Sequence, residues 1–260
     1  MRHIIPIISG KGGVGKSTVA VNLAVALAQT GASVALIDAD LYGPSIPTLL
    51  GAGTIQTDHE GKLIPPQKHG LKYISLGFFL KHPDDPVIWR GPMFNKALTQ
   101  MFQDVAWGTP DFCIVDMPPG TGDAQISLTQ IVKITGAVVV TTPQEVALAD
   151  VRKAVNMLAR VSVPVLGIIE NMAGFADANG EIVDIFGAGG GAKLAQTLNV
   201  PLLASIPIDI AIRKGGDEAQ PVALNADSKS GQIFRNLAAQ LIDLSLQRGL
   251  DTNQGPAIVN

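Results

Sequence analysis

Nine residues near the start of the chain read Gly-Lys-Gly-Gly-Val-Gly-Lys-Ser-Thr and have the residue types that phosphate binding requires. Their spacing fits the pattern G-x-x-x-x-G-K-[ST], in which glycines let backbone N–H groups curl around phosphate oxygens. The lysine of this pattern reaches the terminal phosphates, and the serine hydroxyl binds Mg²⁺ directly. An apolar strand pattern precedes the motif and a helical pattern follows it, which argues against a glycine-rich turn without function. We therefore predict a nucleotide site that includes Gly10, Lys11, Gly12, Gly13, Val14, Gly15, Lys16, Ser17 and Thr18.

A phosphate-binding loop needs an acid on its metal side, at the end of another strand. Asp116 follows the apolar run Phe-Cys-Ile-Val, so its carboxylate is expected at the edge of the sheet where α/β proteins bind ligands. We predict that Asp116 supports Mg²⁺ through water, although an ordinary aspartate at a strand end has the same signature. The loop Pro118–Asp123 combines prolines with glycines and is a candidate sensor of the γ-phosphate.

Two further acids, Asp38 and Asp40, follow the apolar run Ala-Leu-Ile. Successive residues of a strand face opposite ways, so these two carboxylates share a side if the strand continues. One of them would support the Mg²⁺ shell, and the other would orient the water that attacks the nucleotide. Simple solvent exposure is the alternative.

The elements that must position these residues are short apolar runs alternating with longer helical patterns, which is typical of βαβ units. The apolar runs lack polar alternation, so we predict a doubly wound, mostly parallel sheet with helices on both faces, in the α/β class. Leu41–Pro86 is expected to be irregular. We expect residues 1–250 to form a single domain and residues 251–260 to be a flexible tail. The predicted strands are His3–Ile8, Ser33–Ile37, Phe112–Val115, Ala137–Thr141, Val165–Ile169 and Leu202–Ile206. The predicted helices are Lys16–Thr30, Phe94–Val105, Ala124–Ile134, Val146–Arg160, Ala192–Leu198 and Gln232–Leu246.

The composition narrows the class of protein. Apolar residues make up 47% of the 260 residues and charged residues 16%, which favours a compact globule. A net charge of −3 gives no global attraction for nucleic acid. No apolar run reaches the roughly 18 residues that suggest a membrane span, and no secretory leader is evident, so we expect a cytoplasmic protein without a membrane partner.

Cysteine and histidine offer little metal-binding chemistry. Cys113 is the single cysteine, which excludes an intramolecular disulfide and any multi-thiolate site built within one chain. We expect it to be a small buried apolar residue. The four histidines share no ligand spacing, so we expect a surface or loop position for each: His3, His59, His69 and His82.

The second lysine of the loop, Lys11, resembles the deviant phosphate loop of the dimeric ParA, MinD and nitrogenase-iron-protein group. Other stretches make the resemblance more specific, and over residues 3–247 the chain is similar to the Mrp-type iron–sulfur cluster carrier ATPases. Those stretches begin Asp-Ala-Asp-Leu-Tyr-Gly at 38, Trp-Arg-Gly-Pro at 89, Asp-Met-Pro-Pro-Gly at 116, Thr-Thr-Pro-Gln at 141, Glu-Asn-Met at 170 and Phe-Gly-Ala-Gly at 186.

The resemblance implies a slow, Mg²⁺-dependent ATPase that forms a homodimer around its nucleotides. Lys11 of one subunit would reach the phosphates bound by the other, and Asp40 would orient the attacking water, which leaves Asp38 to support Mg²⁺. Asn171, just past a strand end, would bind the adenine edge. Pro207 and Asp209 would flank the base.

Three further residues have two open interpretations each. Asp150 would partner Lys11 in one nucleotide state, or would simply lie on a helix surface. Trp89 and Arg90 would line the dimer or a cargo surface, although core packing explains Trp89 equally well.

The chain departs from that family at one place. Carriers of this type have Cys-x-x-Cys shortly after the Asn-Met pair, and two subunits share a cluster through four thiolates. The corresponding positions here hold Asp177 and Gly180. Iron–sulfur cores require soft thiolate ligands, so the usual bridged cluster is not expected. The extra N-terminal domain of some members is not expected either.

Three functional hypotheses follow. The first is an ATPase of iron–sulfur assembly that acts with a cysteine-bearing partner, with other assembly proteins or with apo-protein clients. The second is a partitioning or positioning switch of the ParA or MinD kind. The third is a scaffold that binds nucleotide and scarcely turns it over.

Overall fold

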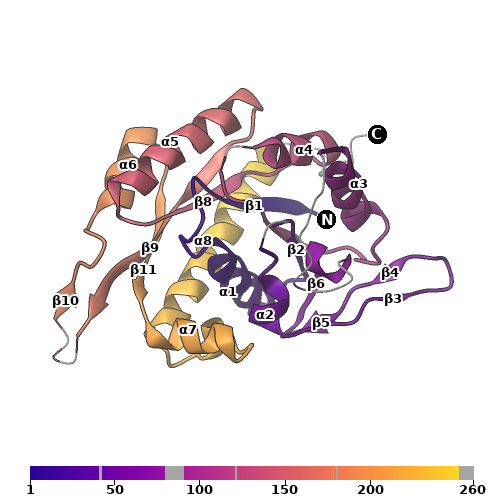
Figure 1. Ribbon diagram of the computed structural model, residues 1–260, viewed down its shortest axis with the longest axis horizontal. Helices are drawn as coiled ribbons and strands as arrows, with labels where there is room; N and C mark the ends of the chain where they lie inside the picture. The colour runs from indigo at the N-terminus through magenta and orange to yellow at the C-terminus, as the bar shows by residue number, and fades with distance from the viewer. Residues whose placement is uncertain (41–42, 80–90, 121, 178, 180, 252–260) are drawn as a thin grey trace.

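The part of the chain that the structure describes contains a mostly parallel sheet of nine strands, with helices on both faces (Figure 1). The computed structural model describes residues 1–40, 43–79, 91–120, 122–177, 179 and 181–251. The strand order is β10-β9-β8-β1-β7-β2-β6-β5, and β11 also pairs with β9. This architecture confirms the predicted α/β class.

The bounds of the elements agree closely with the predicted alternation of strands and helices. The strands are β1 (His3–Ser9), β2 (Val34–Asp38), β3 (Gln56–Thr57), β4 (Leu63–Ile64), β5 (Gln67–Lys68), β6 (Leu71–Ser75), β7 (Phe112–Asp116), β8 (Ala137–Thr141), β9 (Val165–Ala176), β10 (Ile182–Val183) and β11 (Leu202–Ile208). The helices are α1 (Lys16–Gln29), α2 (Ile46–Leu50), α3 (Gly91–Gln103), α4 (Asp123–Ile131), α5 (Glu145–Arg160), α6 (Gly190–Leu198), α7 (Ile210–Asp217) and α8 (Lys229–Asp251).

The central strands are apolar throughout because both of their faces are covered. Every residue of β1 is buried, and β1 lies between β7 and β8 with parallel pairing to each. Ile5 and Ile7 point into one core, whereas Ile4 and Ile8 point into the other. The core that contains Ile5 also contains α1 and α8, and the opposite core contains α3, α4, α5 and α6. The two helical layers are thus on opposite sides of the sheet.

One prediction about the fold is wrong. Within Leu41–Pro86, expected to be irregular, β6 is a central-sheet strand that pairs in parallel with β2 along its whole length. Lys72 interrupts its apolar pattern, which hid the strand. The Lys72 ammonium donates to the carbonyls of Ala106 and Trp107, so the segment after α3 in the same chain stabilises this charge.

A second difference concerns β9, which continues to Ala176 instead of ending at Ile169. Its pairing with β11 reaches Phe175, and its last residues pair with β10 in a hairpin. Asn171 therefore lies inside a strand, not past its end. This extension exists because two other strands supply hydrogen-bond partners, and periodicity along one strand does not reveal such partners.

Candidate functional site

Three strand ends meet at one edge of the sheet. In the β-sheet register Asp116 lies opposite Ile7 of β1 on one side and opposite Asp38 of β2 on the other. Because these strands are parallel, the phosphate-binding loop after β1 begins beside both acids. This edge is the usual ligand site of open α/β sheets.

The loop between β1 and α1 has the backbone of an anion cradle. Gly13 and Gly15 have φ values of 79° and 81°, a conformation that glycine adopts without steric cost. Val14 is buried and anchors the loop in the core. α1 begins at Lys16, and no side chain caps its N-terminus. The N–H groups of its first turn are thus oriented to bind an anion such as a phosphate.

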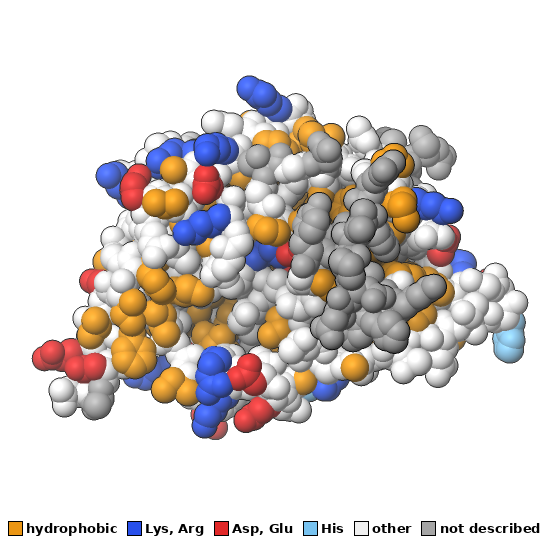
Figure 2. Space-filling model, in the orientation of Figure 1, with side chains coloured by type: hydrophobic (Ala, Val, Ile, Leu, Met, Phe, Trp, Pro, Cys, Tyr) orange, Lys and Arg blue, Asp and Glu red, His pale blue; other side chains and the backbone are white. Residues whose placement is uncertain are grey.

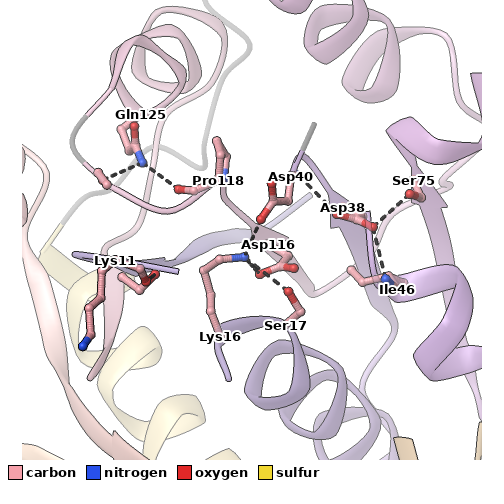
Figure 3. Close-up of polar contacts among 12 residues, drawn as sticks. Lys11, Lys16, Ser17, Asp38, Asp40, Ile46, Ser75, Asp116, Pro118 and Gln125 are labelled. Atoms are coloured by element: carbon pink, nitrogen blue, oxygen red, sulfur yellow. Dashed lines mark hydrogen bonds and ion pairs between the residues drawn. The ribbon is translucent and has the colours of Figure 1, made fainter. Parts of the chain in front are cut away.

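Lys16 is the centre of a buried ionic cluster (Figure 3). Its ammonium lies 2.5 Å from Oδ1 of Asp116 and 3.5 Å from Oδ2 of Asp40. It also donates to the Ser17 hydroxyl at 3.3 Å. The residues predicted to bind phosphate, metal and attacking water therefore converge, although they lie as far apart as 100 positions in the sequence. Their individual roles remain predictions.

Asp116 is fully buried, and one of its two carboxylate oxygens accepts no hydrogen bond from the described residues. Burial raises the pKa of its carboxyl, and the Lys16 ammonium acts in the opposite direction. Its Oδ2 atom has no hydrogen-bond partner within the described chain. Hard cations such as Mg²⁺ and their bound waters prefer oxygen ligands, so this free oxygen fits the predicted magnesium site.

Asp38 is fully buried and organises the loop after β2 (Figure 3). Its Oδ1 accepts from the backbone N–H of Asp40. Its Oδ2 accepts from the Ile46 N–H and the Ser75 hydroxyl. Burial, followed by the nearby charge of Asp116, raises the pKa of Asp38 to about 8. These contacts position Asp40 and the start of α2, whereas the predicted support of Mg²⁺ by Asp38 remains a prediction.

Lys11 points away from this cluster (Figure 3). Its ammonium donates to Oε1 of Gln144 at 3.2 Å. Asp150, the partner considered from the sequence, forms an ion pair with Lys153 at 3.1 Å instead. The Lys11 and Asp150 side chains therefore have different partners in this structure. The Lys11 side chain is directed away from the site that its own loop builds.

The residues predicted to hold the base have local partners. The Asn171 amide donates to the Val14 carbonyl at 2.8 Å, which ties β9 to the phosphate-binding loop. Asp209 caps α7 by accepting from the Ala211 N–H, and it also accepts from the Ser230 hydroxyl. Pro207 is half-buried in β11. Contacts of these residues with a base remain predictions.

Three further functional candidates emerge from the contacts in the structure. Gln125 is buried beneath the loop after β7, and its amide donates to the carbonyls of Pro118 and Gly120 (Figure 3). Ser75 and Gln144 contact Asp38 and Lys11 from distant strands and helices. Gln144 belongs to the Thr-Thr-Pro-Gln stretch, which does not indicate its contact with Lys11, and no motif marks Gln125 or Ser75. These contacts depend on the pairing of β2 with β6 and on the packing of α5 on the loop.

The described chain does not supply ligands for an iron–sulfur cluster. The Asp177 carboxylate accepts from the N–H groups of Asn179 and Glu181 and so closes the hairpin turn. Cys113 is buried in β7, as predicted, and burial raises the pKa of its thiol. No group of three His, Cys, Asp or Glu side chains in the described ranges could hold a metal ion. Asp177 and Cys113 thus do not fit the thiolate ligands that a bound iron–sulfur cluster requires.

The remaining predictions are mixed. His3 is buried in β1 and stacks on Phe112 with ring centroids 5.3 Å apart, so its predicted surface position is wrong. Because β1 is buried on both faces, the His3 ring packs against a neighbouring aromatic ring instead of facing solvent. No helix among the described residues is long and apolar enough to span a membrane. The predictions for His82, Trp89, Arg90, Gly180 and the tail at 252–260 fall outside the described residues.

Comparisons with known proteins identify the family. A family model described as the NUBPL iron-transfer P-loop NTPase matches residues 1–242. The chain is 51% identical over 249 residues to an iron–sulfur cluster carrier protein of Synechocystis, covering 93% of this chain and 70% of that protein.

Solved structures agree with this result. A nucleotide-binding protein from Archaeoglobus fulgidus, in complex with ADP, is 39% identical with a TM-score of 0.74, covering 86% of this chain and 89% of that one. MinD from Pyrococcus horikoshii, complexed with Mg-ADP, is 26% identical with a TM-score of 0.70, covering 95% and 99%. Together, the loop, the acids at the sheet edge and these matches show that the chain belongs to the iron-transfer P-loop NTPases, the family of the iron–sulfur cluster carrier proteins.

Proposed function

We propose that this protein is a slow, Mg²⁺-dependent ATPase that works as a dimeric switch in iron–sulfur assembly without holding the usual bridged cluster itself. The observation that carries this proposal is the buried cluster of Lys16, Asp116 and Asp40, with Lys16 2.5 Å from Asp116 and 3.5 Å from Asp40. A lysine, a metal-side acid and a water-orienting acid are the parts that phosphoryl transfer to water requires. We also propose that residues 1–250 form one domain.

The nucleotide would be held by the loop of β1 and α1. Lys16 and the backbone N–H groups of the loop would bind the phosphates, and Ser17 would bind Mg²⁺ directly. Asp116, with its free Oδ2, would hold a water of the metal shell. When bound, Mg²⁺ supplies positive charge that stabilises the transferred phosphoryl group. Asp40 would accept a hydrogen bond from the attacking water.

Nucleotide binding must rearrange the ionic cluster. The Lys16 ammonium now donates to Asp116 and Ser17, and phosphate oxygens would compete for the same ammonium. The loop after β2 depends on Asp38, and the loop after β7 depends on Gln125. Loss of the γ-phosphate contacts would change the positions of both loops, and we infer that this change alters the dimer.

The orientation of Lys11, away from the ionic cluster of its own subunit, supports a role in a second subunit. A cation that leaves its own site can neutralise charge on phosphates bound by a facing copy, which would couple dimer formation to ATP. One face of the molecule exposes apolar side chains, gathered in the region of β9, β10 and β11 (Figure 2). Ile182 and Val183 of β10 are 64% and 47% exposed, and Ile210 at the start of α7 is 59% exposed. Exposed apolar surfaces are typical of protein contacts.

We infer that the iron–sulfur cluster is a cargo and not a resident cofactor of this protein. Asp177 occupies the first thiolate position and its carboxylate is engaged in the hairpin turn. A cysteine-bearing partner or an apo-protein client would therefore supply the thiolates. A positioning function of the MinD kind is less favoured, because the likeness to MinD is 26% identity against 51% for an iron–sulfur carrier.

Two variants test the proposal. Lys16→Ala should abolish tight ATP binding, measured by titration calorimetry, because it removes the buried cation of the phosphate site. Lys11→Ala should retain ATP binding by the monomer but weaken the dimer, measured as a higher dissociation constant in sedimentation velocity with Mg²⁺ and a non-hydrolysable ATP analogue. Tight ATP binding by the first variant, or an unchanged dimer with the second, would contradict the proposed site.

A further inference from the structure

Lys11 has a defined partner in its own subunit, and that partner is not an acid. Its ammonium donates to Oε1 of Gln144 at 3.2 Å. Gln144 is the residue before α5. Of the acids nearest on that helix, Glu145 pairs with Arg152 and Asp150 pairs with Lys153. The Lys11 ammonium is therefore held by a neutral amide and not by a carboxylate, although carboxylates lie on the same helix.

The backbones on both sides of this contact are held in place. The Ser9 hydroxyl donates to the Lys11 carbonyl at 2.9 Å. A side-chain carbon on Gly10 would lie 2.4 Å from the Asp150 carbonyl carbon, so the loop packs directly on the α5 backbone. The Gln144 carbonyl accepts from the N–H groups of Ala147 and Leu148. The Lys11 and Gln144 side chains thus extend from two fixed points.

The chemistry of this pair suits a contact that must be released. The bond from the Lys11 ammonium to the Gln144 amide has one charged partner, whereas a carboxylate acceptor would add the attraction of a second, opposite charge. A phosphate group bound by a facing subunit carries several negative oxygens and would outcompete the amide for the ammonium. A carboxylate in the place of Gln144 would compete much better.

We propose that Gln144 is a positioning residue that holds Lys11 in its own subunit until nucleotide-dependent association draws the lysine across the interface. The proposal rests on the proposed function of Lys11 in a second subunit. Gln144 would set the balance between the two positions of Lys11 and would not touch the nucleotide. Its identity as a neutral acceptor would determine how readily the dimer forms.

The test compares two substitutions with opposite predicted effects. Gln144→Glu strengthens the hold on Lys11, so we expect the dimer dissociation constant with Mg²⁺ and a non-hydrolysable ATP analogue to rise about tenfold, or about 1.4 kcal/mol. Gln144→Ala removes the hold, so we expect that constant to fall about threefold. Acidic residues stabilise the first turn of a helix, so the glutamate variant is expected to fold.

One background and one control variant make the test specific. In Lys11→Ala both effects should vanish, because the group that Gln144 holds is absent. Gln240→Glu, an exposed position on α8, is the matched control for added charge and should leave the dissociation constant unchanged. Binding of the ATP analogue to the monomer should remain within about twofold in every Gln144 variant.

The outcomes separate this inference from the function on which it rests. If Lys11→Ala weakens the dimer but both Gln144 variants match the parent, the inference is overturned and the proposed function stands. The same holds if both Gln144 variants weaken the dimer equally, or if their effects persist in Lys11→Ala, since a merely structural role predicts this result. A parent protein that stays monomeric, or a Lys11→Ala dimer as tight as the parent, overturns both.

Discussion

The ammonium of Lys16 lies 2.5 Å from the carboxylate of Asp116, at the point where α1 begins and β7 ends. Asp116 is fully buried and Lys16 is 6% exposed, so each charge depends on the other for compensation. Burial of an unpaired ion costs several kcal/mol, whereas a close and hydrogen-bonded pair offsets much of that cost. The pair joins the phosphate-binding loop to the metal side of the site, so a ligand that binds one of the two must affect the other.

Asp116→Asn should separate nucleotide binding from metal use. The substitution retains the shape of the side chain but removes the charge and the free carboxylate oxygen that fits a magnesium-bound water. Outer-shell metal partners are typically worth about 10- to 100-fold in metal affinity or activity. We expect ATPase turnover to fall by that factor and to require more Mg²⁺, measured as a Mg²⁺ titration of phosphate release. An unchanged Mg²⁺ midpoint would contradict the assignment.

Asp40→Asn should impair hydrolysis more than binding. If Asp40 orients the attacking water and accepts its proton, its loss should lower turnover by about 10²- to 10⁴-fold, the usual range for such a group. ATP affinity should change only a few-fold, because Asp40 lies 3.5 Å from Lys16 and does not build the phosphate cradle. Single-turnover hydrolysis and calorimetry check the two quantities separately. A parallel loss of affinity would assign Asp40 to binding.

Gly10→Ala should destabilise the fold even without nucleotide. The added carbon would lie 2.4 Å and 2.5 Å from backbone atoms of Asp150 and Val151, so α5 or the loop must shift. Overpacking of this kind costs about 1–3 kcal/mol. Gly12→Ala is the matched control, since its nearest neighbour would be a Pro119 carbon at 3.9 Å. Urea unfolding should show a lower stability for Gly10→Ala only; equal stability of the two would argue against the close packing.

Asp38 should make stability depend on pH. The pKa of Asp38 is raised to about 8 by burial and then by Asp116, whereas in an unfolded chain it is about 3.9. Between these values the folded protein retains a proton that the unfolded chain releases. The free energy of unfolding should therefore fall as pH rises from about 4 to about 8.

Asp38→Asn removes this titration. The decline of the unfolding free energy with pH should become shallower, by at most about 1.4 kcal/mol per pH unit, the limit for one proton. Urea unfolding at several pH values between 5 and 8 measures the slope in each protein. If parent and variant show the same slope, the Asp38 carboxyl does not hold a proton in the folded state.

Anaerobic reconstitution with iron and sulfide should yield no stoichiometric, stable cluster on the isolated protein. The only thiol, Cys113, is buried in β7, and the Asp177 carboxylate is engaged in a turn. Visible absorbance and iron counting provide the measurement. Cys113→Ser is the control and should show the same low iron content. A stable cluster that Cys113→Ser abolishes would show that the buried strand opens to bind iron.

Much of this protein follows from local sequence. The continuous apolar runs identify β1, β7 and β8 because strands covered on both faces must be apolar, and that pattern is readable one residue at a time. The phosphate-binding loop is recognisable because glycines, lysine and serine must occur at fixed spacing within one turn. The single cysteine, Cys113, is likewise a fact of the sequence, and it excludes a pair of thiolates within one chain.

Tertiary structure decided the partners of those residues. β6 becomes a central-sheet strand because β2 supplies its hydrogen bonds, despite Lys72 in its middle. The contacts of Lys16 with Asp116 and of Lys11 with Gln144 join positions 100 and 133 residues apart. Their geometry depends on which strands are neighbours and on how closely α5 packs on Gly10. Sequence alone therefore determined which chemical groups the protein carries, and the fold decided which of them meet, because strand pairing and helix packing are not encoded in any local pattern.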